Sequence, residues 1–135
     1  MDRTFLDTNI ILRYLTRDNE QKAQASLSLL LHLEKSEEKM ITSPMVIFET
    51  IFTLQSSYKI PRNKIEELLM PIISLQGLKL EHKKVYNRAF KLYCSKNISF
   101  ADAYNIAFME DQGIEIIYSY DTDFDFVEGI KRKEA

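Results

Sequence analysis

The sequence contains few of the residues that break helices or cross-link a chain. Its 135 residues include three glycines, three prolines and a single cysteine, Cys94. One cysteine excludes a disulfide within the chain and is typical of a reducing compartment. Few glycines and prolines argue against long flexible linkers and favour helices. The length is that of one domain, so we expect residues 1–135 to form a single domain.

Targeting segments and a strong excess of charge are also missing. The N-terminus shows no basic-then-apolar signal peptide, and no apolar run approaches the roughly 20 residues of a membrane helix. We therefore expect a cytoplasmic protein that does not contact a membrane. Lys and Arg total 18 and Asp and Glu total 20, a net charge of −2. Nucleic-acid-binding domains are usually basic, but a basic rim and an acidic metal centre would cancel in this sum.

Short apolar segments alternate with helical patterns along the chain. Strands are predicted at 3–6, 40–42, 78–80 and 114–118, and the tail at 131–134 is expected to be polar and frayed. Helices are predicted at 9–15, 20–35, 44–58, 61–75, 83–95 and 99–112, with one helical turn at 123–127. This alternation is typical of an α/β fold with a parallel sheet and helices on its faces. Ligands of such sheets gather beyond the carboxyl ends of the strands.

Acidic residues follow the first and the last predicted strand. Asp7 comes after the first strand and Asp121 after the last. If these strands are parallel neighbours, both carboxylates emerge at one edge of the sheet. Asp123 and Asp125 follow closely, and the alternative for these two is that they cap the next helical turn.

Two further acids are predicted to lie on helices. Glu49 has apolar neighbours one turn away, Met45 and Phe52, so we expect it to point into an apolar surface. There it would have to be neutral, ion-paired or bound to a cation. Asp102 follows Ser99 at the spacing of a capping box, and this structural reading is compatible with a carboxylate that faces a cleft.

Four carboxylates in one pocket would repel each other unless a cation neutralised them. Mg²⁺ and Mn²⁺ are hard ions that prefer such oxygen ligands. Zinc is not indicated, because His32 and His82 are isolated and there is no Cys/His cluster. Without a nucleophilic Ser, Cys or His arrangement, this cluster indicates phosphoryl chemistry. Small polar side chains near the cluster could orient water or a phosphate oxygen, or cap helices: Thr8, Asn9, Asn105, Ser119 and Asp123.

These motifs, in this order, resemble the PIN-domain ribonucleases. The resemblance rests on Asp7-Thr8-Asn9, the isolated Glu49, Ser99-Phe100-Ala101-Asp102-Ala103 and Asp121-Thr122-Asp123-Phe124. The short chain is similar to the VapC-type toxins of toxin–antitoxin pairs. The resemblance implies a PIN-like three-layer α/β sandwich, with a short central parallel sheet and helices on both faces.

The resemblance also implies Mg²⁺- or Mn²⁺-dependent hydrolysis of RNA phosphodiester bonds. Carried onto this chain, it makes Asp7 and Asp102 the principal metal ligands, while Glu49 and Asp121 complete the acidic pocket directly or through water. Thr8 corresponds to the polar residue that often follows the first aspartate. A homodimer and a cognate antitoxin protein that blocks the cleft are further implications.

RNA contact requires cations near the acids. The candidates are Arg13, Lys59, Arg62, Lys64, Lys83, Lys84, Arg88 and Lys91, and each could equally lie on a solvated face. Tyr58, Tyr86 and Tyr93 could stack on bases, or pack in the protein interior.

Two other functions remain open at the level of sequence. One is an aspartate-based phosphatase, although Asp7-Thr8-Asn9 lacks the second aspartate, two places on, of the haloacid-dehalogenase type. The other is a non-catalytic binding module whose acids only cap helices.

Overall fold

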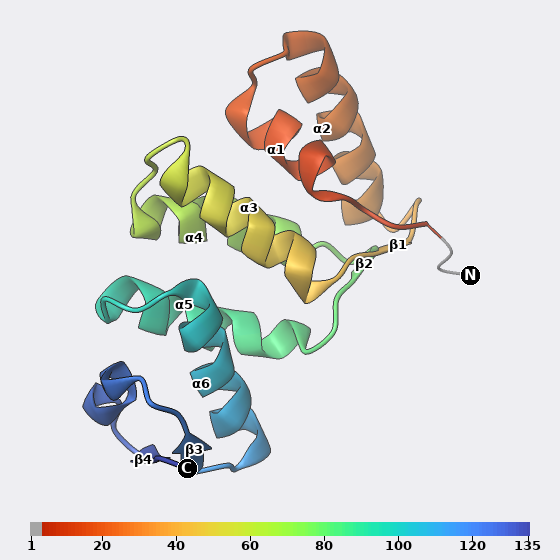
Figure 1. The fold of residues 1–135 in the computed structure, drawn as a ribbon. Helices are drawn as coiled ribbons and strands as arrows, with labels where there is room; N and C mark the ends of the chain where they lie inside the picture. Colours follow the sequence, from red (N-terminus) through yellow and green to blue (C-terminus); the bar gives the residue numbers. More distant parts are fainter. Residues whose placement is uncertain (1–3) are drawn as a thin grey trace. The chain divides into compact units, whose positions relative to one another are not determined.

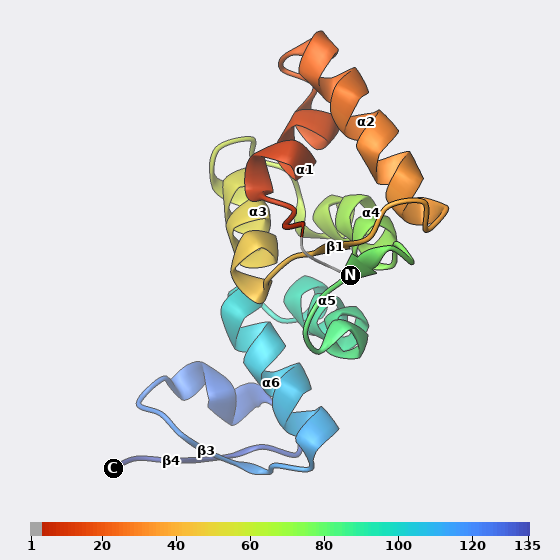
Figure 2. The same cartoon turned by 90° about the vertical axis from the view of Figure 1, so that its right-hand side faces the viewer.

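The computed structural model describes residues 4–135, which fall into two compact units. The N-terminal unit extends to Lys84, and the C-terminal unit comprises Val85–Ala135 (Figures 1 and 2). The predicted strand at 3–6 begins at Arg3, which lies outside the described residues. No helix within residues 4–135 has both the length and the apolar character that crossing a membrane requires.

Three parallel segments form the sheet of the N-terminal unit. Phe5 makes a parallel bridge with Ile41, and strand β1 (Met40–Ile41) pairs in parallel with β2 (Leu78–Lys79). The Leu6 N–H donates to the carbonyl of Ile41 at 2.9 Å. The carboxyl ends of these segments therefore meet at one edge, and Asp7 directly follows the first segment. Among the described residues, the last predicted strand pairs with residues 131–133 in a separate sheet, so the condition that the first and last strands are neighbours is not met.

Two of the helices of the N-terminal unit begin at polar side chains that cap them. The helices of this unit are α1 (Thr8–Thr16), α2 (Glu20–Glu34), α3 (Pro44–Ser56) and α4 (Arg62–Ile73). The Asn19 side chain accepts a hydrogen bond from the Lys22 amide, and Ser43 caps α3 with Pro44 at its first position. Pro71 lies in the last turn of α4, which ends two residues later, as expected for proline.

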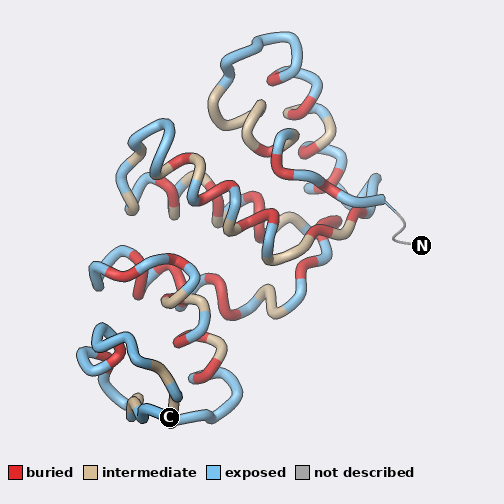
Figure 3. Tube along the Cα trace, in the orientation of Figure 1, coloured by how far each residue is buried: buried red, intermediate tan, exposed pale blue. Residues whose placement is uncertain are grey.

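The C-terminal unit is built around a pair of helices and a cluster of aromatic rings. A 3₁₀ turn, η1 (Lys83–Val85), leads into α5 (Tyr86–Ser95), which packs against α6 (Phe100–Gln112). The rings of Phe90 and Phe100 lie 4.7 Å apart, centre to centre. Tyr86 and Tyr93 are fully buried in this cluster, so the prediction that they could stack on RNA bases is wrong. Figure 3 shows the buried positions of the chain in red.

The tail is ordered, which corrects the prediction that it frays. Strand β4 (Lys131–Lys133) pairs in parallel with β3 (Ile116–Tyr118), and the two strands run side by side (Figure 2). Arg132 holds the tail in place. Its guanidinium donates to both carboxylate oxygens of Asp125, at 2.8 and 3.2 Å, and to the carbonyl of Ser119 at 3.1 Å.

Gly77 leads the chain from α4 into β2 at a point with no room for a side chain. A Cβ atom there would lie 2.3 Å from the Glu38 carbonyl oxygen and 2.7 Å from that of Leu33. The Gly77 N–H also donates to the same Leu33 carbonyl at 2.9 Å, and the Gly77 carbonyl accepts from the Met40 amide. Backbone atoms therefore enclose this position on the approach to the sheet.

We predict that Gly77→Ala lowers the free energy of unfolding by about 3 kcal/mol, because backbone atoms must move to admit the methyl group. The control is Gly113→Ala, where φ is 71° but no atom lies within 4 Å of the added Cβ. That change should cost only about 1 kcal/mol. Urea denaturation followed by circular dichroism measures both values. A cost at Gly77 no greater than that at Gly113 would contradict the prediction.

Candidate active site

Asp7 stands at the N-terminus of α1 with a carboxylate that does not cap the helix. Its backbone has the extended N-cap conformation, φ −94° and ψ 162°, but its side chain makes no capping hydrogen bond. The residue is exposed. Helix capping therefore does not account for an acid at this strand end.

The residue after Asp7 links α1 to α3. Thr8 is buried, and its hydroxyl donates a long hydrogen bond of 3.4 Å to the Glu49 carboxylate. Glu49 lies in the second turn of α3, the helix that follows β1. The N-terminal unit thus places Glu49 beside the neighbour of Asp7, which supports the predicted association of these two acids.

Glu49 is exposed, so the expectation that it points into an apolar surface is wrong. Its one-turn neighbours Met45 and Phe52 share that exposed side of α3, at 72% and 70% exposure. The core-facing side of the helix carries Val46, Ile47, Thr50, Ile51 and Leu54. Because α3 is apolar on both sides, the apolar neighbours of Glu49 did not show which side is buried.

The C-terminal unit brings Asp102 and Asp121 close enough to interact. Ser99 caps α6 by accepting a hydrogen bond from the Asp102 amide at 3.1 Å, so the predicted capping pair is confirmed. Burial and the negative charge of Asp121 raise the pKa of the Asp102 carboxyl, and the charge of Asp123 adds to the effect. A hydrogen bond with Ser99 lowers this pKa in part. The ionised form of Asp102 is therefore disfavoured on balance.

Asp121 caps a turn with its carboxylate, and the negative charge of that carboxylate also acts on Asp102. The Asp121 carboxylate accepts from the Asp123 amide at 2.9 Å at the start of η2 (Thr122–Phe126), while the Asp121 amide donates to the Ser119 hydroxyl at 3.0 Å. Asp125 has a structural role instead. Its hydrogen bonds with Arg132 lower the pKa of its carboxyl. Of the three aspartates, Asp125 is the one neutralised by an ion pair with Arg132.

The candidate acids occur as two groups, one in each unit. Asp7 and Glu49 belong to the N-terminal unit, and Asp102, Asp121 and Asp123 to the C-terminal unit. Within residues 4–135, no three Asp, Glu, His or Cys side chains lie close enough together to hold a metal ion. The chemistry of the candidate donors nevertheless fits a hard divalent cation, because all of them are carboxylates.

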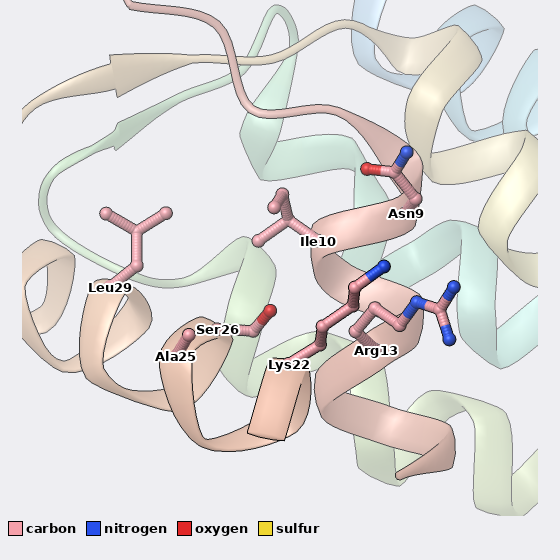
Figure 4. Close-up of a pocket in the computed structure, with 7 residues that line it drawn as sticks. All are labelled: Asn9, Ile10, Arg13, Lys22, Ala25, Ser26 and Leu29. Carbon is pink, nitrogen blue, oxygen red and sulfur yellow. The ribbon is translucent and has the colours of Figure 1, made fainter. Parts of the chain in front are cut away.

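Two of the cations proposed for RNA contact have structural roles. The Lys83 ammonium donates to the carbonyls of Leu75 and Leu78, both at 2.8 Å. The Arg88 guanidinium pairs with Glu110 at 2.8 Å. Arg13 instead lines a pocket together with Asn9 and Lys22 (Figure 4). Lys22 was absent from the sequence-based candidates, because its position opposite Arg13 depends on how α1 packs against α2.

Comparisons with known proteins identify the family of this chain. The sequence matches the PIN domain over residues 4–130, a stretch that includes every candidate acid. A VapC ribonuclease of Aquifex aeolicus (strain VF5) is 27% identical over 115 residues, which cover 85% of this chain and 84% of that protein.

The raised pKa of Asp102 predicts that this acid costs stability in the absence of metal. A carboxyl whose folded pKa exceeds its unfolded value of about 3.9 destabilises the fold above that pH, and the cost is complete once the pH passes the folded pKa. Asp102→Asn should therefore raise the melting temperature at pH 7 in EDTA. The rise should be less than about 4 °C, because water still screens the group.

Differential scanning fluorimetry at pH 7 and near pH 3.5 tests this expectation, and the gain should disappear at the lower pH. Glu128→Gln, which removes an exposed charge from the same unit, is the matched control. A lower melting temperature for Asp102→Asn at pH 7 would show that its carboxylate stabilises the fold.

Proposed function

The chain belongs to the PIN-domain family, and from this premise we propose that it is a metal-dependent endoribonuclease that acts as the toxin of a type II toxin–antitoxin pair. Membership confirms the predicted family and the α/β fold class. The relative described as a VapC ribonuclease supports the nuclease and toxin parts of the proposal.

The observation that carries the proposal is the difference between two kinds of acid in this chain. Asp125 is neutralised by Arg132, as expected of an acid that stabilises the fold. In the structure of residues 4–135, Asp7, Glu49, Asp102 and Asp121 make no ion pair, although burial and neighbouring charge act on Asp102. Unneutralised carboxylates beside one another are costly to a fold, and a divalent cation would remove that cost.

We propose that these four acids serve one active site. Asp7 and Asp102 would hold the cation, and Glu49 and Asp121 would complete the acidic set directly or through water. Bound Mg²⁺ or Mn²⁺ would supply positive charge for the phosphate oxygens and a water molecule of lowered pKa.

The polar residues around the acids have positioning roles in this proposal. Thr8 holds the Glu49 carboxylate through its hydroxyl, and Ser119 holds the backbone of Asp121. The amide of Asp123 keeps the Asp121 side chain in its orientation. Asn9 is exposed in the first turn of α1 and is available to a phosphate oxygen or to water.

The proposal includes the partners and setting of such a toxin. These are an RNA substrate, a cognate antitoxin protein, a homodimer and a cytoplasmic location. The single cysteine is compatible with a reducing compartment. We also propose that both units belong to one PIN domain, because one family match spans them.

One observation favours a non-catalytic binding module as the second candidate. The Asp121 carboxylate already has a structural use, since it caps η2 by accepting from the Asp123 amide. If all four acids had only such uses, the chain would bind partners without cleaving RNA. The aspartate-based phosphatase is disfavoured because Asn9 stands where the haloacid-dehalogenase type has its second aspartate.

Cleavage of a labelled single-stranded RNA tests the nuclease directly. We expect cleavage with Mn²⁺ or Mg²⁺ and none in EDTA. Glu49→Gln should slow it about 10–100-fold, as loss of an outer-shell group does, and Asp7→Asn and Asp102→Asn should slow it further. Glu128→Gln, which removes a negative charge outside the proposed set, should cleave like the wild type.

Equal cleavage by the wild type, Asp7→Asn and Asp102→Asn would identify a contaminating nuclease. Absence of cleavage by the wild type with either metal would favour the binding module. A phosphatase would instead form an aspartyl-phosphate, which mass spectrometry of the intact protein would detect.

A further inference from the structure

A pocket of about 480 Å³ lies between α1 and α2 of the N-terminal unit (Figure 4). This volume falls in the range of small-ligand sites. Helix α1 contributes Asn9, Ile10 and Arg13 to its lining, and α2 contributes Lys22, Ser26 and Leu29. Apart from Asn9, the residues that line this pocket have no role in the proposed metal chemistry.

Both helices contribute polar and apolar side chains to the lining of the pocket. Asn9 and Arg13 are four residues apart and share one face of α1. Lys22, Ser26 and Leu29 recur at helical spacing along α2. Figure 4 shows the side chains of Arg13 and Lys22 reaching toward the same part of the pocket from the two helices, with Leu29 at the other end. The pocket thus combines a cationic part with an apolar part.

The cations of this pocket lack acidic partners, although acids lie close in sequence. Glu20 is bound by Arg17 at 2.7 Å and by Gln24 at 3.0 Å, and Asp18 accepts a hydrogen bond from Tyr58. Within residues 4–135, neither Arg13 nor Lys22 forms an ion pair. Two neighbouring positive charges repel, and an anion between them would remove that repulsion. The electrostatics of the pocket therefore favour an anionic ligand.

The pocket begins beside the acids of the proposed active site. Asn9 is two residues after Asp7, so their Cα atoms are less than about 8 Å apart. Arg13 lies about 6 Å further along the axis of α1. If the reacting phosphate of a polymeric substrate lay at Asp7, the next monomer of that substrate would be within reach of the pocket.

We propose that this pocket binds one nucleotide of a single-stranded RNA substrate, next to the phosphodiester that is cleaved; the inference rests on the proposed ribonuclease function. Arg13 and Lys22 bind the backbone phosphate. Ile10 and Leu29 contact the face of the base, and the Asn9 amide hydrogen-bonds to the base edge or the ribose. A nucleotide matches the lining because it joins an anion to a flat, largely apolar ring.

Binding of a fluorescein-labelled short RNA of randomised sequence, measured by fluorescence anisotropy in EDTA, tests the pocket without cleavage. The double variant Arg13→Gln/Lys22→Gln should bind at least about 10-fold more weakly at 50 mM salt. Its plot of log affinity against log salt should be shallower by about 0.7, the contribution of one single-strand phosphate contact.

Two further variants distinguish RNA binding in the pocket from general electrostatic attraction between the protein and RNA. Ala25→Trp fills the pocket, of which Ala25 is also a lining residue, and leaves both cations in place. It should weaken binding several-fold without changing the salt slope. The control Lys35→Gln/Lys39→Gln removes the same charge from exposed positions elsewhere in the N-terminal unit and should bind RNA like the wild type.

Wild-type affinity and salt slope in Arg13→Gln/Lys22→Gln would overturn the proposal, as would equal losses in this variant and the lysine control. Competition by a short peptide of alternating Leu and Glu, with no effect of the pocket variants on RNA binding, would assign the pocket to a protein partner and also overturn it. The two proposals fail separately. Normal cleavage by the pocket variants rejects only the nucleotide pocket, whereas RNA binding without cleavage by the wild type rejects only the nuclease.

Discussion

Repulsion between neighbouring carboxylates is the constraint on which this account depends. In the C-terminal unit, burial and then the negative charges of Asp121 and Asp123 raise the pKa of the Asp102 carboxyl, which disfavours its ionised form. The same unit neutralises Asp125 with Arg132, whose guanidinium also holds the tail against β3. Acids that support the fold are thus paired. Among the candidate acids within residues 4–135, Asp7 and Asp121 form no ion pair and follow strands, where α/β sheets place their ligands.

Local patterns predicted most of the elements, because the signals that start helices are local. Asn19, Ser43 and Ser99 each cap a helix whose first residue was predicted to within one position. Arrangements that depend on distant contacts could not be predicted in this way. The polar segment Lys131–Lys133 is a strand because β3 pairs with it and Arg132 bonds to Asp125 and Ser119.

The order of the acids along the chain identified the candidate site residues, but it did not show how exposed each of them is. The capping of α6 by Ser99 was visible in the sequence. The exposure of Glu49 was not, because α3 is apolar on both sides and only packing selects the buried one. Lys22 was missed for a related reason, since its relation to Arg13 exists only once α1 and α2 pack together. A net charge of −2 likewise conceals a local cationic pocket beside acidic residues.

The central claim, that acids from both units bind the same cation, is tested most directly by a double-mutant cycle on Mn²⁺ affinity. Isothermal titration calorimetry would compare the wild type, Asp7→Asn, Asp102→Asn and the double variant. If one ion is shared, each single substitution weakens binding at least about 10-fold, and the double variant departs from the sum of the two effects by more than about 0.5 kcal/mol. Additive effects, or wild-type affinity in either single variant, would contradict a shared cation and the active site built on it.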